Sequence, residues 1–344
     1  MRFYSGIDLH ARESVICIID DKDTIHFRDT LSNHLEYFLS TLNRFTPRPA
    51  VAVEATLNWY WLVDGLQDGG FQVKLAHPFG LQVIKKAKVK TDKRDAFHLA
   101  RLLRLGALPE SYIYPKEKRP MRDLLRKRQK TVSLRAADYV ALHRILMQHG
   151  VCDIASTQMK KIKMHQLEQY LVHPALRYHC AMALERIQFY SRHIEILEEI
   201  ILGAAGEEAD FELLQTLPGV GKILAAIIMY ETGEISRFPS AKQYCSYARV
   251  VPGIAQSSSS IRRGKGSKQG NPYLKFAFMQ AAALAVRYVG PIRRFRQKHM
   301  AKRRSKARKL ISISIVAHKL ATAAYHVLTN QEPFREEVMF GSYL

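Results

Sequence analysis

The chain has 344 residues, of which 47% are hydrophobic and 24% are charged, and this composition excludes a largely disordered protein and a small disulfide-stapled one. Lys and Arg number 53 against 31 Asp and Glu, and the net charge of +22 favours a polyanionic partner, with nucleic acid first. The chain has neither a run of about 18 apolar residues nor a signal-peptide pattern at its start, so we expect a soluble cytoplasmic protein without a membrane partner.

The first 110 residues alternate β-rich runs with amphipathic stretches, which predicts one α/β domain over residues 1–110. Three strands should come first, and alternating helices and strands should follow. This order is typical of a ribonuclease H-like sheet. The expected strands are 3–8, 14–19, 24–28, 50–53 and 71–76, and the expected helices are 35–42 and 59–66.

Residues 111–205 are expected to form a helical region, because they contain few glycines and many Leu, Arg, Lys, Glu and Gln. A stripe with coiled-coil spacing covers about three heptads, which leaves two interpretations equally open: a hairpin packed on its own chain, or a dimer contact. The stripe consists of Cys180, Ala183, Ile187, Tyr190, Ile194, Leu197 and Ile201. The four cysteines form no CxxC pair, so we expect reduced structural thiols at Cys17, Cys152, Cys180 and Cys245.

Residues 206–344 are predicted to form a mainly helical domain that binds a polyanion. The 97 residues between Glu234 and Glu332 contain 20 Lys or Arg and no acidic residue. Helices are expected at 273–288 and 310–328. The alternative is a basic face that is merely solvated.

A glycine turn begins this last domain, in Leu217-Pro218-Gly219-Val220-Gly221-Lys222. A helix, a tight turn and a second helix would let backbone N–H groups approach a phosphate, as in a helix-hairpin-helix DNA contact. Gly219, Gly221 and Lys222 are therefore candidate nucleic-acid contacts. An ordinary interhelical turn is the alternative.

Four carboxylates are the candidate metal ligands. Asp8 and Glu54 each end an apolar strand, and ligands of open α/β sheets bind at the carboxyl ends of strands. Asp92 and Asp95 lie three apart at a predicted helix start, so both project from one face. Such oxygen donors suit Mg²⁺, with Mn²⁺ as an alternative ion, and nearby cations would steer phosphates to it: Lys90, Lys93 and Arg94. Taken singly, Asp92 and Asp95 would serve as helix caps and Glu54 as a salt-bridge partner of a lysine.

A serine run, Ser257 to Ser260, lies inside the acid-free region and precedes a basic stretch. Serine runs are most often flexible linkers. Here, however, a hydroxyl held against DNA phosphates could attack phosphorus and form a covalent phosphoserine link. The charge stabilisation and the DNA contacts would come from basic residues that follow: Arg262, Arg263, Lys265 and Lys268.

Taken together, these motifs resemble the DEDD-type transposases of insertion sequences, the IS one-ten and IS eleven-eleven family, which includes the Piv-type DNA invertases. The resemblance runs nearly end to end. In the first domain it is carried by Gly6-Ile7-Asp8, Val53-Glu54-Ala55-Thr56 and Lys90-Thr91-Asp92-Lys93-Arg94-Asp95-Ala96. In the rest of the chain it is carried by Leu217-Pro218-Gly219-Val220-Gly221, Arg237-Phe238-Pro239-Ser240-Ala241, Lys268-Gln269-Gly270-Asn271 and Ala317-His318-Lys319-Leu320-Ala321.

The resemblance implies a RuvC-like catalytic domain with the magnesium site, a coiled-coil insertion and a C-terminal transposase domain with a nucleophilic serine. By position in the motif that serine is Ser257, with Ser258 as the second candidate. The resemblance further implies homodimers or homotetramers, donor and target DNA duplexes as substrates, and a structured guide RNA. It places the protein in bacterial cytoplasm, at the nucleoid.

Two other functions remain open from the residues. One is a RuvC-like, metal-dependent nuclease that selects DNA structures and uses water as its nucleophile. The other is an architectural nucleic-acid binder whose carboxylates only balance lysines. Covalent trapping of DNA would separate the recombinase from the nuclease, and the binder would be indifferent to Asp8→Asn.

Overall fold

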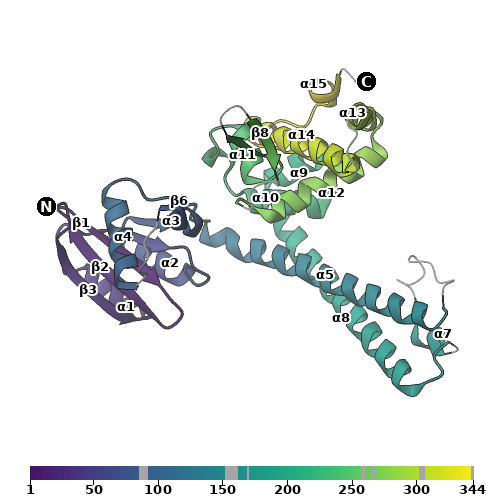
Figure 1. The fold of residues 1–344 in the computed structure, drawn as a ribbon, viewed down its shortest axis with the longest axis horizontal. Coiled ribbons are helices and arrows are strands. Elements are labelled where there is room, and N and C mark those ends of the chain that lie inside the picture. The colour runs from purple at the N-terminus through teal and green to yellow at the C-terminus, as the bar shows by residue number, and fades with distance from the viewer. Residues whose placement is uncertain are drawn as a thin grey trace. The chain divides into compact units, whose positions relative to one another are not determined.

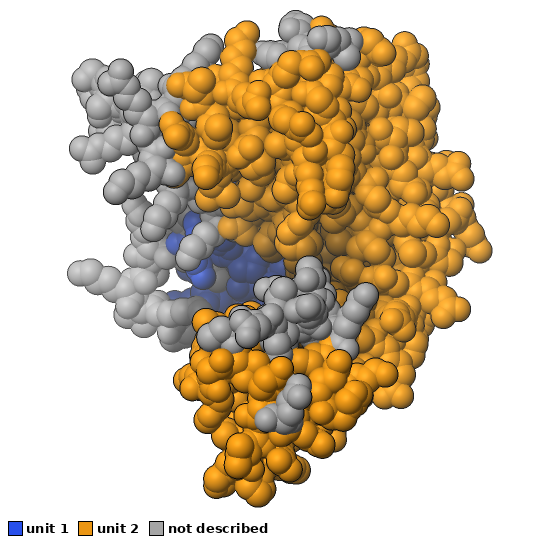
Figure 2. Space-filling view, turned by 90° about the vertical axis from the view of Figure 1, so that its right-hand side faces the viewer, with its two compact units in different colours: residues 1–117 blue, residues 118–344 orange. Residues whose placement is uncertain are grey.

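The computed structural model describes residues 1–84, 92–151, 162–168, 170–257, 260–264, 269–301 and 307–341. Of residues 83, 84, 92 and 93, and of 253–257 and 260–264, it describes the backbone alone. The chain divides into two compact units, Met1–Glu117 and Lys118–Leu344, which Figure 2 colours separately. Most of the region 111–205, expected as a domain of its own, belongs to the second unit.

A six-stranded mixed sheet forms the first unit, in the order β3-β2-β1-β4-β5-β6. The β1–β2, β2–β3 and β5–β6 pairs are antiparallel, and the β1–β4 and β4–β5 pairs are parallel. The expected meander and the ribonuclease H-like order are confirmed, and the short β6 is an addition to the prediction. The strands are β1 Phe3–Leu9, β2 Glu13–Asp20, β3 Ile25–Ser32, β4 Ala50–Glu54, β5 Val73–Ala76 and β6 Glu110–Ser111.

Helices cover both faces of this sheet (Figure 1). Because side chains alternate along a strand, Ile7, Ile16 and Val53 face α1 (Leu35–Leu42) and α2 (Tyr60–Asp68) in one core. The opposite face packs against α4 (Asp92–Arg104), through Ala52 and Leu99. Each fully buried Ile, Val or Leu side chain contributes about 1.5–3 kcal/mol to the free energy of unfolding. A short helix, α3 (Pro78–Ile84), follows β5.

The second unit begins with a long antiparallel helical hairpin, α5 (Arg119–Gln148) and α8 (Pro174–Ala205), after the turn η1 (Lys116–Lys118). A short α7 (Met164–Glu168) lies between them in the sequence. Polar pairs join the two helices in antiparallel register: Arg128 with Glu198, Arg135 with Ser191, and Asp138 with Arg186. The apolar stripe from Cys180 to Ile201 is packed inside the second unit, largely against α5, so the intramolecular interpretation is the one that the structure shows.

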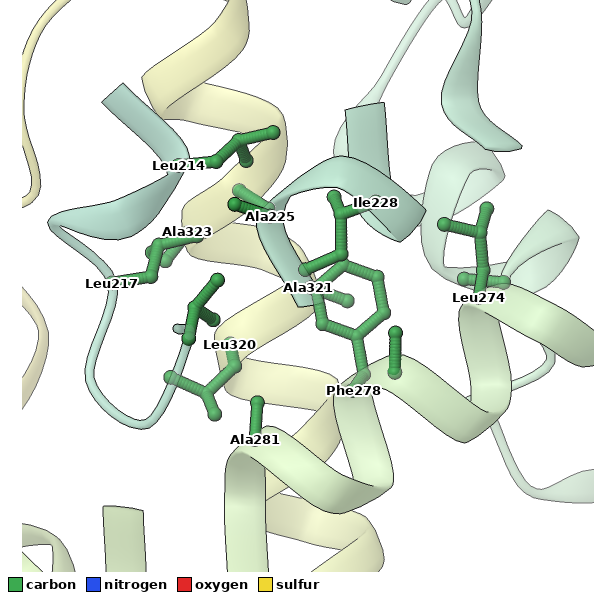
Figure 3. Close-up of a cluster of buried hydrophobic side chains, with 14 of the residues drawn as sticks. Leu214, Leu217, Ala225, Ile228, Leu274, Phe278, Ala281, Leu320, Ala321 and Ala323 are labelled. Carbon is green, nitrogen blue, oxygen red and sulfur yellow. The ribbon is translucent and has the colours of Figure 1, made fainter. Parts of the chain in front are cut away.

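A helical cluster completes the second unit around one hydrophobic core, part of which Figure 3 shows. Leu214 and Ile228 meet Phe278 and Leu320 there, from four different helices. Asn271 caps α12 by accepting hydrogen bonds from the N–H groups of Tyr273 and Leu274. The elements are α9 Ala209–Gln215, α10 Lys222–Thr232, η2 Ile235–Arg237, α11 Ala241–Tyr247, α12 Pro272–Tyr288, α13 Gly290–Ala301, α14 Arg308–Asn330 and α15 Glu336–Phe340.

Among the described helices, α14 alone is long and apolar enough to cross a membrane by length and composition. Its buried side chains, among them Val316, Leu320 and Ala324, belong to the core of the helical cluster. Its apolar character is therefore explained by packing against α11, α12 and α13.

The serine run forms part of a two-stranded antiparallel ribbon, β7 (Gly253–Ser257) and β8 (Ser260–Gly264). Ser257 pairs with Ser260 at the tip of this ribbon. The serine composition favours a flexible linker and does not predict these strands.

Candidate active site

Asp8 and Glu54 occupy matching positions on neighbouring strands. β1 and β4 run parallel, with Ile7 opposite Val53. The next residue is Asp8 on β1 and Glu54 on β4. Parallel strands lie about 4.8 Å apart, and residues in register share a face of the sheet. The prediction that the first and fourth strands are neighbours, with both carboxylates at their carboxyl ends, is confirmed.

The helix α4 covers the face that carries these carboxylates, and Gly6 permits its close approach. A Cβ atom added at Gly6 would lie 2.1 Å from the carbonyl oxygen of Ala96 and 2.5 Å from the nitrogen of Ala100. Gly6 and Asp8 are two residues apart and therefore point to the same face. The backbone of α4 thus lies directly against the strand that carries Asp8.

Ion pairs fix the direction in which α4 crosses the sheet. Near its end, Arg104 donates from Nε to Asp23 at 2.7 Å, and Arg101 lies 3.1 Å from the same carboxylate. Asp23 belongs to the turn after Asp20, and Asp20 pairs with Phe3 at the start of β1. The 13 residues of α4 are about 20 Å long, close to the length of β1, so the first turn of α4 lies over the Asp8 end.

Asp95 belongs to that first turn and is buried, with 5% of its surface exposed. It precedes Leu99, which packs on the sheet, by one helical turn, so it lies on the inner face of α4. Asp8 is also 5% exposed, and Glu54 is half-buried. Three of the four predicted carboxylates therefore gather at one end of one face. The backbone of Asp92 begins α4 at the same end, and its side chain lies outside the described set.

The loops after β1 and β4 are tied together at this end. The side-chain amides of Asn33 and Asn58 both donate to the carbonyl oxygen of His10, at 2.8 and 2.9 Å. The His10 ring lies with Nε2 3.5 Å from the Asp8 carboxylate. Sequence reasoning did not name His10 as a site residue, although its position two residues after a strand-end aspartate could have suggested it.

The side chains at this end of the sheet are of the kind that binds a divalent ion. Burying a carboxylate costs free energy unless cations or hydrogen-bond donors surround it, and hard ions such as Mg²⁺ prefer oxygen ligands. Asp8, Glu54 and Asp95 supply such oxygen ligands, and all three belong to the same end of the sheet. Among the side chains that the structure describes, no three of Asp, Glu, His or Cys lie close enough together to hold an ion by themselves.

The predicted cations around the carboxylates are mostly outside the described part of the chain. Arg94 is exposed on the first turn of α4. Lys93 is described only as backbone of that turn, and Lys90 lies outside the described residues.

The predicted serine belongs to the other unit. The backbone of Ser257 ends β7, and the backbones of Arg262 and Arg263 lie on β8, opposite Ala255 and Ile254. Ser258, Lys265 and Lys268 lie outside the described residues. The structure therefore places the serine motif on a ribbon of the second unit and the carboxylates on the sheet of the first.

The glycine turn has the expected helix-turn-helix form, between α9 and α10, and it serves packing as well. Gly219 has φ +78°, and a Cβ atom there would lie 2.2 Å from the carbonyl oxygen of Ala281. Glycine at this position thus allows the turn to touch α12. Gly221 has open space around its α-carbon, and Lys222 is exposed at the start of α10.

Two models of transposase families match this chain. One describes a DEDD transposase of IS110 type and matches residues 5–150, and the other describes the transposase family IS116/IS110/IS902 and matches residues 211–298. The chain belongs to the IS110/IS1111 family of DEDD transposases. Transposases of this kind are DNA strand-transfer enzymes, and the DEDD domain implies a divalent metal ion.

Individual relatives of this IS110-family transposase agree with the two models. The y4qE protein of Sinorhizobium fredii is 29% identical over 200 residues, 57% of this chain and about half (48%) of that protein. The transposase of insertion sequence IS1328 from Yersinia enterocolitica is 25% identical over 289 residues, 80% of this chain and 82% of that one. The pilin gene-inverting protein of Moraxella bovis is 33% identical over 128 residues, 37% of this chain and 39% of that one.

Proposed function

We propose that this transposase cuts and rejoins DNA strands of an insertion sequence through a covalent phosphoserine link, with Mg²⁺ or Mn²⁺ at Asp8, Glu54, Asp92 and Asp95. The observation that carries the proposal is the placement of Asp8, Glu54 and Asp95 at one end of one face of the sheet. These oxygens lie in a protein whose excess positive charge attracts phosphates.

The chemistry follows from the residue types. A divalent ion bound there would supply positive charge to the oxygens that become anionic in the transition state. The hydroxyl oxygen of Ser257 attacks phosphorus and loses its proton, one bridging P–O bond breaks, and the departing strand oxygen takes up a proton and leaves as a hydroxyl, so no net proton is gained or lost. The Ser257–phosphate ester keeps the bond available for rejoining, because attack by another strand hydroxyl releases the serine again.

The carboxylates and the serine lie on different units, and we propose that a homodimer or homotetramer brings them together on donor and target DNA. We further propose that a structured guide RNA directs the choice of DNA. The acid-free stretch between Glu234 and Glu332, with its 20 basic residues, suits a protein that holds several nucleic-acid strands. Purifying the protein from its host and sequencing the RNA that travels with it tests this point. A discrete non-coding RNA is expected, and purification without one would favour direct recognition of the DNA.

Covalent trapping tests the strand-transfer chemistry. The protein is incubated with DNA that carries the ends of its element and Mg²⁺, and the products are separated under denaturing conditions. We expect a protein-linked DNA strand that disappears in Ser257→Ala. Loss of strand transfer with retained DNA binding is expected in Asp8→Asn. The matched control is Asp29→Asn, a carboxylate exposed on the edge strand β3, which should leave both unchanged.

Two outcomes would contradict the proposal. Free cut ends that Ser257→Ala still produces would indicate a nuclease that uses water, and the serine ribbon would then have another role. Normal recombination by Asp8→Asn would show that the carboxylates hold no catalytic ion.

A further inference from the structure

A pocket of about 430 Å³ lies in the helical cluster at the base of the β7–β8 ribbon. Its lining includes Arg237, Gln243, Tyr247, Arg249 and Gln269, and none of its lining residues is acidic. Its volume lies in the range of small-ligand sites. Two of the sequence motifs that received no role, around Arg237 and around Gln269, meet here.

Arg237 presents its guanidinium group from a fixed position. The group lies 4.2 Å from the centre of the Phe238 ring and 4.5 Å from the centre of the Tyr247 ring. Its Nε donates to the carbonyl oxygen of Thr232 at 3.1 Å. Phe238 is itself buried and packs edge-on against Tyr244, so the aromatic rings that contact the Arg237 guanidinium are held in place by the core. A cation held in this way is preorganised to bind an anion.

Arg249 stands in an unusual backbone conformation. Its φ of +56° falls in the left-handed region, which favours glycine, at the C-terminal end of α11. A non-glycine residue there costs on the order of 1 kcal/mol. Its half-buried side chain reaches the pocket, and its Nε is buried without a hydrogen-bond partner among the described residues. Glycine would avoid this strain, so an arginine here indicates a function for its side chain, which has a buried Nε donor.

The pocket has the charge of an anion site. Two guanidinium groups and no carboxylate line this cavity, so its lining favours an anion over a cation. Guanidinium groups bind phosphate oxygens through charge-assisted, often paired hydrogen bonds. The amides of Gln243 and Gln269 and the hydroxyl of Ser246 add neutral donors to the same lining.

The pocket also joins both ends of the ribbon. Val251 lines it just before β7, and Gln269 and Gly270 line it after β8. The chain then continues into Asn271, whose N–H donates to the Tyr247 carbonyl oxygen at 2.6 Å and whose side chain donates to buried Glu231 at 2.7 Å. The base of the ribbon is thus anchored in the core beside the two arginines.

We propose that this pocket binds a backbone phosphodiester group of the DNA strand on which the ribbon acts, with Arg237 and Arg249 as its ligands. The inference rests on the proposed function, because it names the part of the DNA substrate that is held beside the serine. Ser257 lies six residue steps after Val251, and an extended chain of that length spans at most about 20 Å. Successive phosphates of one strand are about 3.4 Å apart along the axis of duplex DNA. The bound phosphate therefore lies within about six nucleotides of the attacked bond.

The test measures DNA binding in a Ser257→Ala background, so that it does not depend on strand transfer. Fluorescence anisotropy follows a labelled duplex that carries the ends of the element, at several KCl concentrations. Arg249→Gly removes the guanidinium and suits the left-handed backbone, so this variant should unfold at the same temperature or a higher one. We expect it to bind the duplex about tenfold more weakly. The slope of log K against log salt should fall by about 0.9, the value for one lost phosphate contact.

Two further variants make the result specific. Lys242→Ala removes one charge from the exposed side of α11, outside the pocket, and should change affinity by less than about twofold. Arg249→Lys keeps the charge and loses the planar fork, and should bind with intermediate affinity. Equal affinity and equal salt slope in Arg249→Gly and the parent would overturn the proposal, as would equal losses in Arg249→Gly and Lys242→Ala.

A scan of the DNA locates the phosphate. Single neutral methylphosphonate linkages are placed along the strand, one per duplex. We expect one position, within six nucleotides of the bond that trapping identifies, where the neutral linkage weakens binding by the parent and leaves Arg249→Gly unaffected. If trapping yields no covalent link, the serine mechanism is wrong. A neutral linkage that weakens binding by the parent, and not by Arg249→Gly, would still support the phosphate site in the pocket. Equal interference in both proteins at every position would overturn the assignment.

Discussion

Gly6 sets the distance between the carboxylate-bearing strand and the helix that carries Asp95. A methyl group there would lie 2.1 Å from one backbone atom of α4 and 2.5 Å from another, so the helix must move. We predict that Gly6→Ala lowers the free energy of unfolding by about 1–3 kcal/mol and abolishes strand transfer. Thermal unfolding and the trapping reaction measure the two effects.

The matched control is Gly203→Ala. Gly203 lies on the exposed side of α8, with no neighbour within 4 Å of an added Cβ atom. Alanine should stabilise that helix by about 0.5–1 kcal/mol and leave strand transfer unchanged. Equal stability of Gly6→Ala and the parent would contradict the close approach of α4 to β1.

Asp20 makes the first unit sensitive to acid. The hydrogen bond from the His26 side chain, followed by those from the backbone of Lys22 and Thr24, lowers the pKa of Asp20 from 3.8 to about 2. Because the folded pKa is depressed, the stabilisation is present above about pH 4 and is lost as pH falls toward 2. We predict that Asp20→Asn lowers the unfolding temperature at pH 7 and flattens its decline between pH 4 and pH 2. An unchanged pH profile in this variant would refute the role of the carboxylate.

Buried Glu231 joins three helices near the base of the β7–β8 ribbon. Its carboxylate, on α10, accepts from Arg126 of α5 at 2.7 and 2.8 Å and from the Asn271 side chain that caps α12. The Glu231 side chain is 1% exposed and that of Arg126 is 33% exposed, so the buried carboxylate depends on these partners for its hydrogen bonds. We predict that Glu231→Gln lowers the free energy of unfolding by about 2 kcal/mol, since Arg126 loses its counter-charge.

Glu198→Gln is the comparison variant for Glu231. Glu198 pairs with Arg128 between α5 and α8, and its side chain is 30% exposed. Water screens this pair, so the loss should stay below about 1 kcal/mol. Denaturant unfolding of both variants provides the comparison, and a smaller effect for Glu231 than for Glu198 would contradict the network.

The sequence revealed those elements whose pattern is local. Strands β1, β2 and β4 were predictable because apolar side chains alternate or run together between turn residues, and Asp8 and Glu54 were noticeable because they end such strands. The β7–β8 ribbon was not, because serine has little strand preference and the pairing depends on how its base is anchored. The pocket of Arg237 and Arg249 escaped notice since η2, α11 and residues 269–270 meet only through tertiary packing. The sequence pattern favours Gly219 as a phosphate contact, and it does not reveal the packing of Gly219 against α12, which is distant in the sequence.

The charge of the whole molecule is divided unequally. Residues 1–117 contain 16 Lys and Arg against 14 Asp and Glu, which leaves 37 against 17 for residues 118–344. The first unit is nearly neutral at +2, and the second has +20. Phosphate attraction therefore belongs to the second unit, and the first supplies carboxylates that would repel DNA on their own.

This division predicts where DNA protects the protein. Acetylation of lysines in the intact chain, compared with and without bound DNA by mass spectrometry, should show protection concentrated in residues 118–344. DNA affinity should fall steeply as salt rises, because counterions are released from the DNA on binding. Protection spread evenly over both units would contradict the division.

The long antiparallel arm of α5 and α8 has a further consequence. Its polar contacts include one step of seven residues on both helices, from Arg128 and Glu198 to Arg135 and Ser191, before the spacing changes at Asp138 and Arg186. Removing that step of seven residues from each helix together would leave the remaining pairs in register, while the arm becomes about 10 Å shorter. The length of this arm is therefore set by how many such turns the two helices pair along.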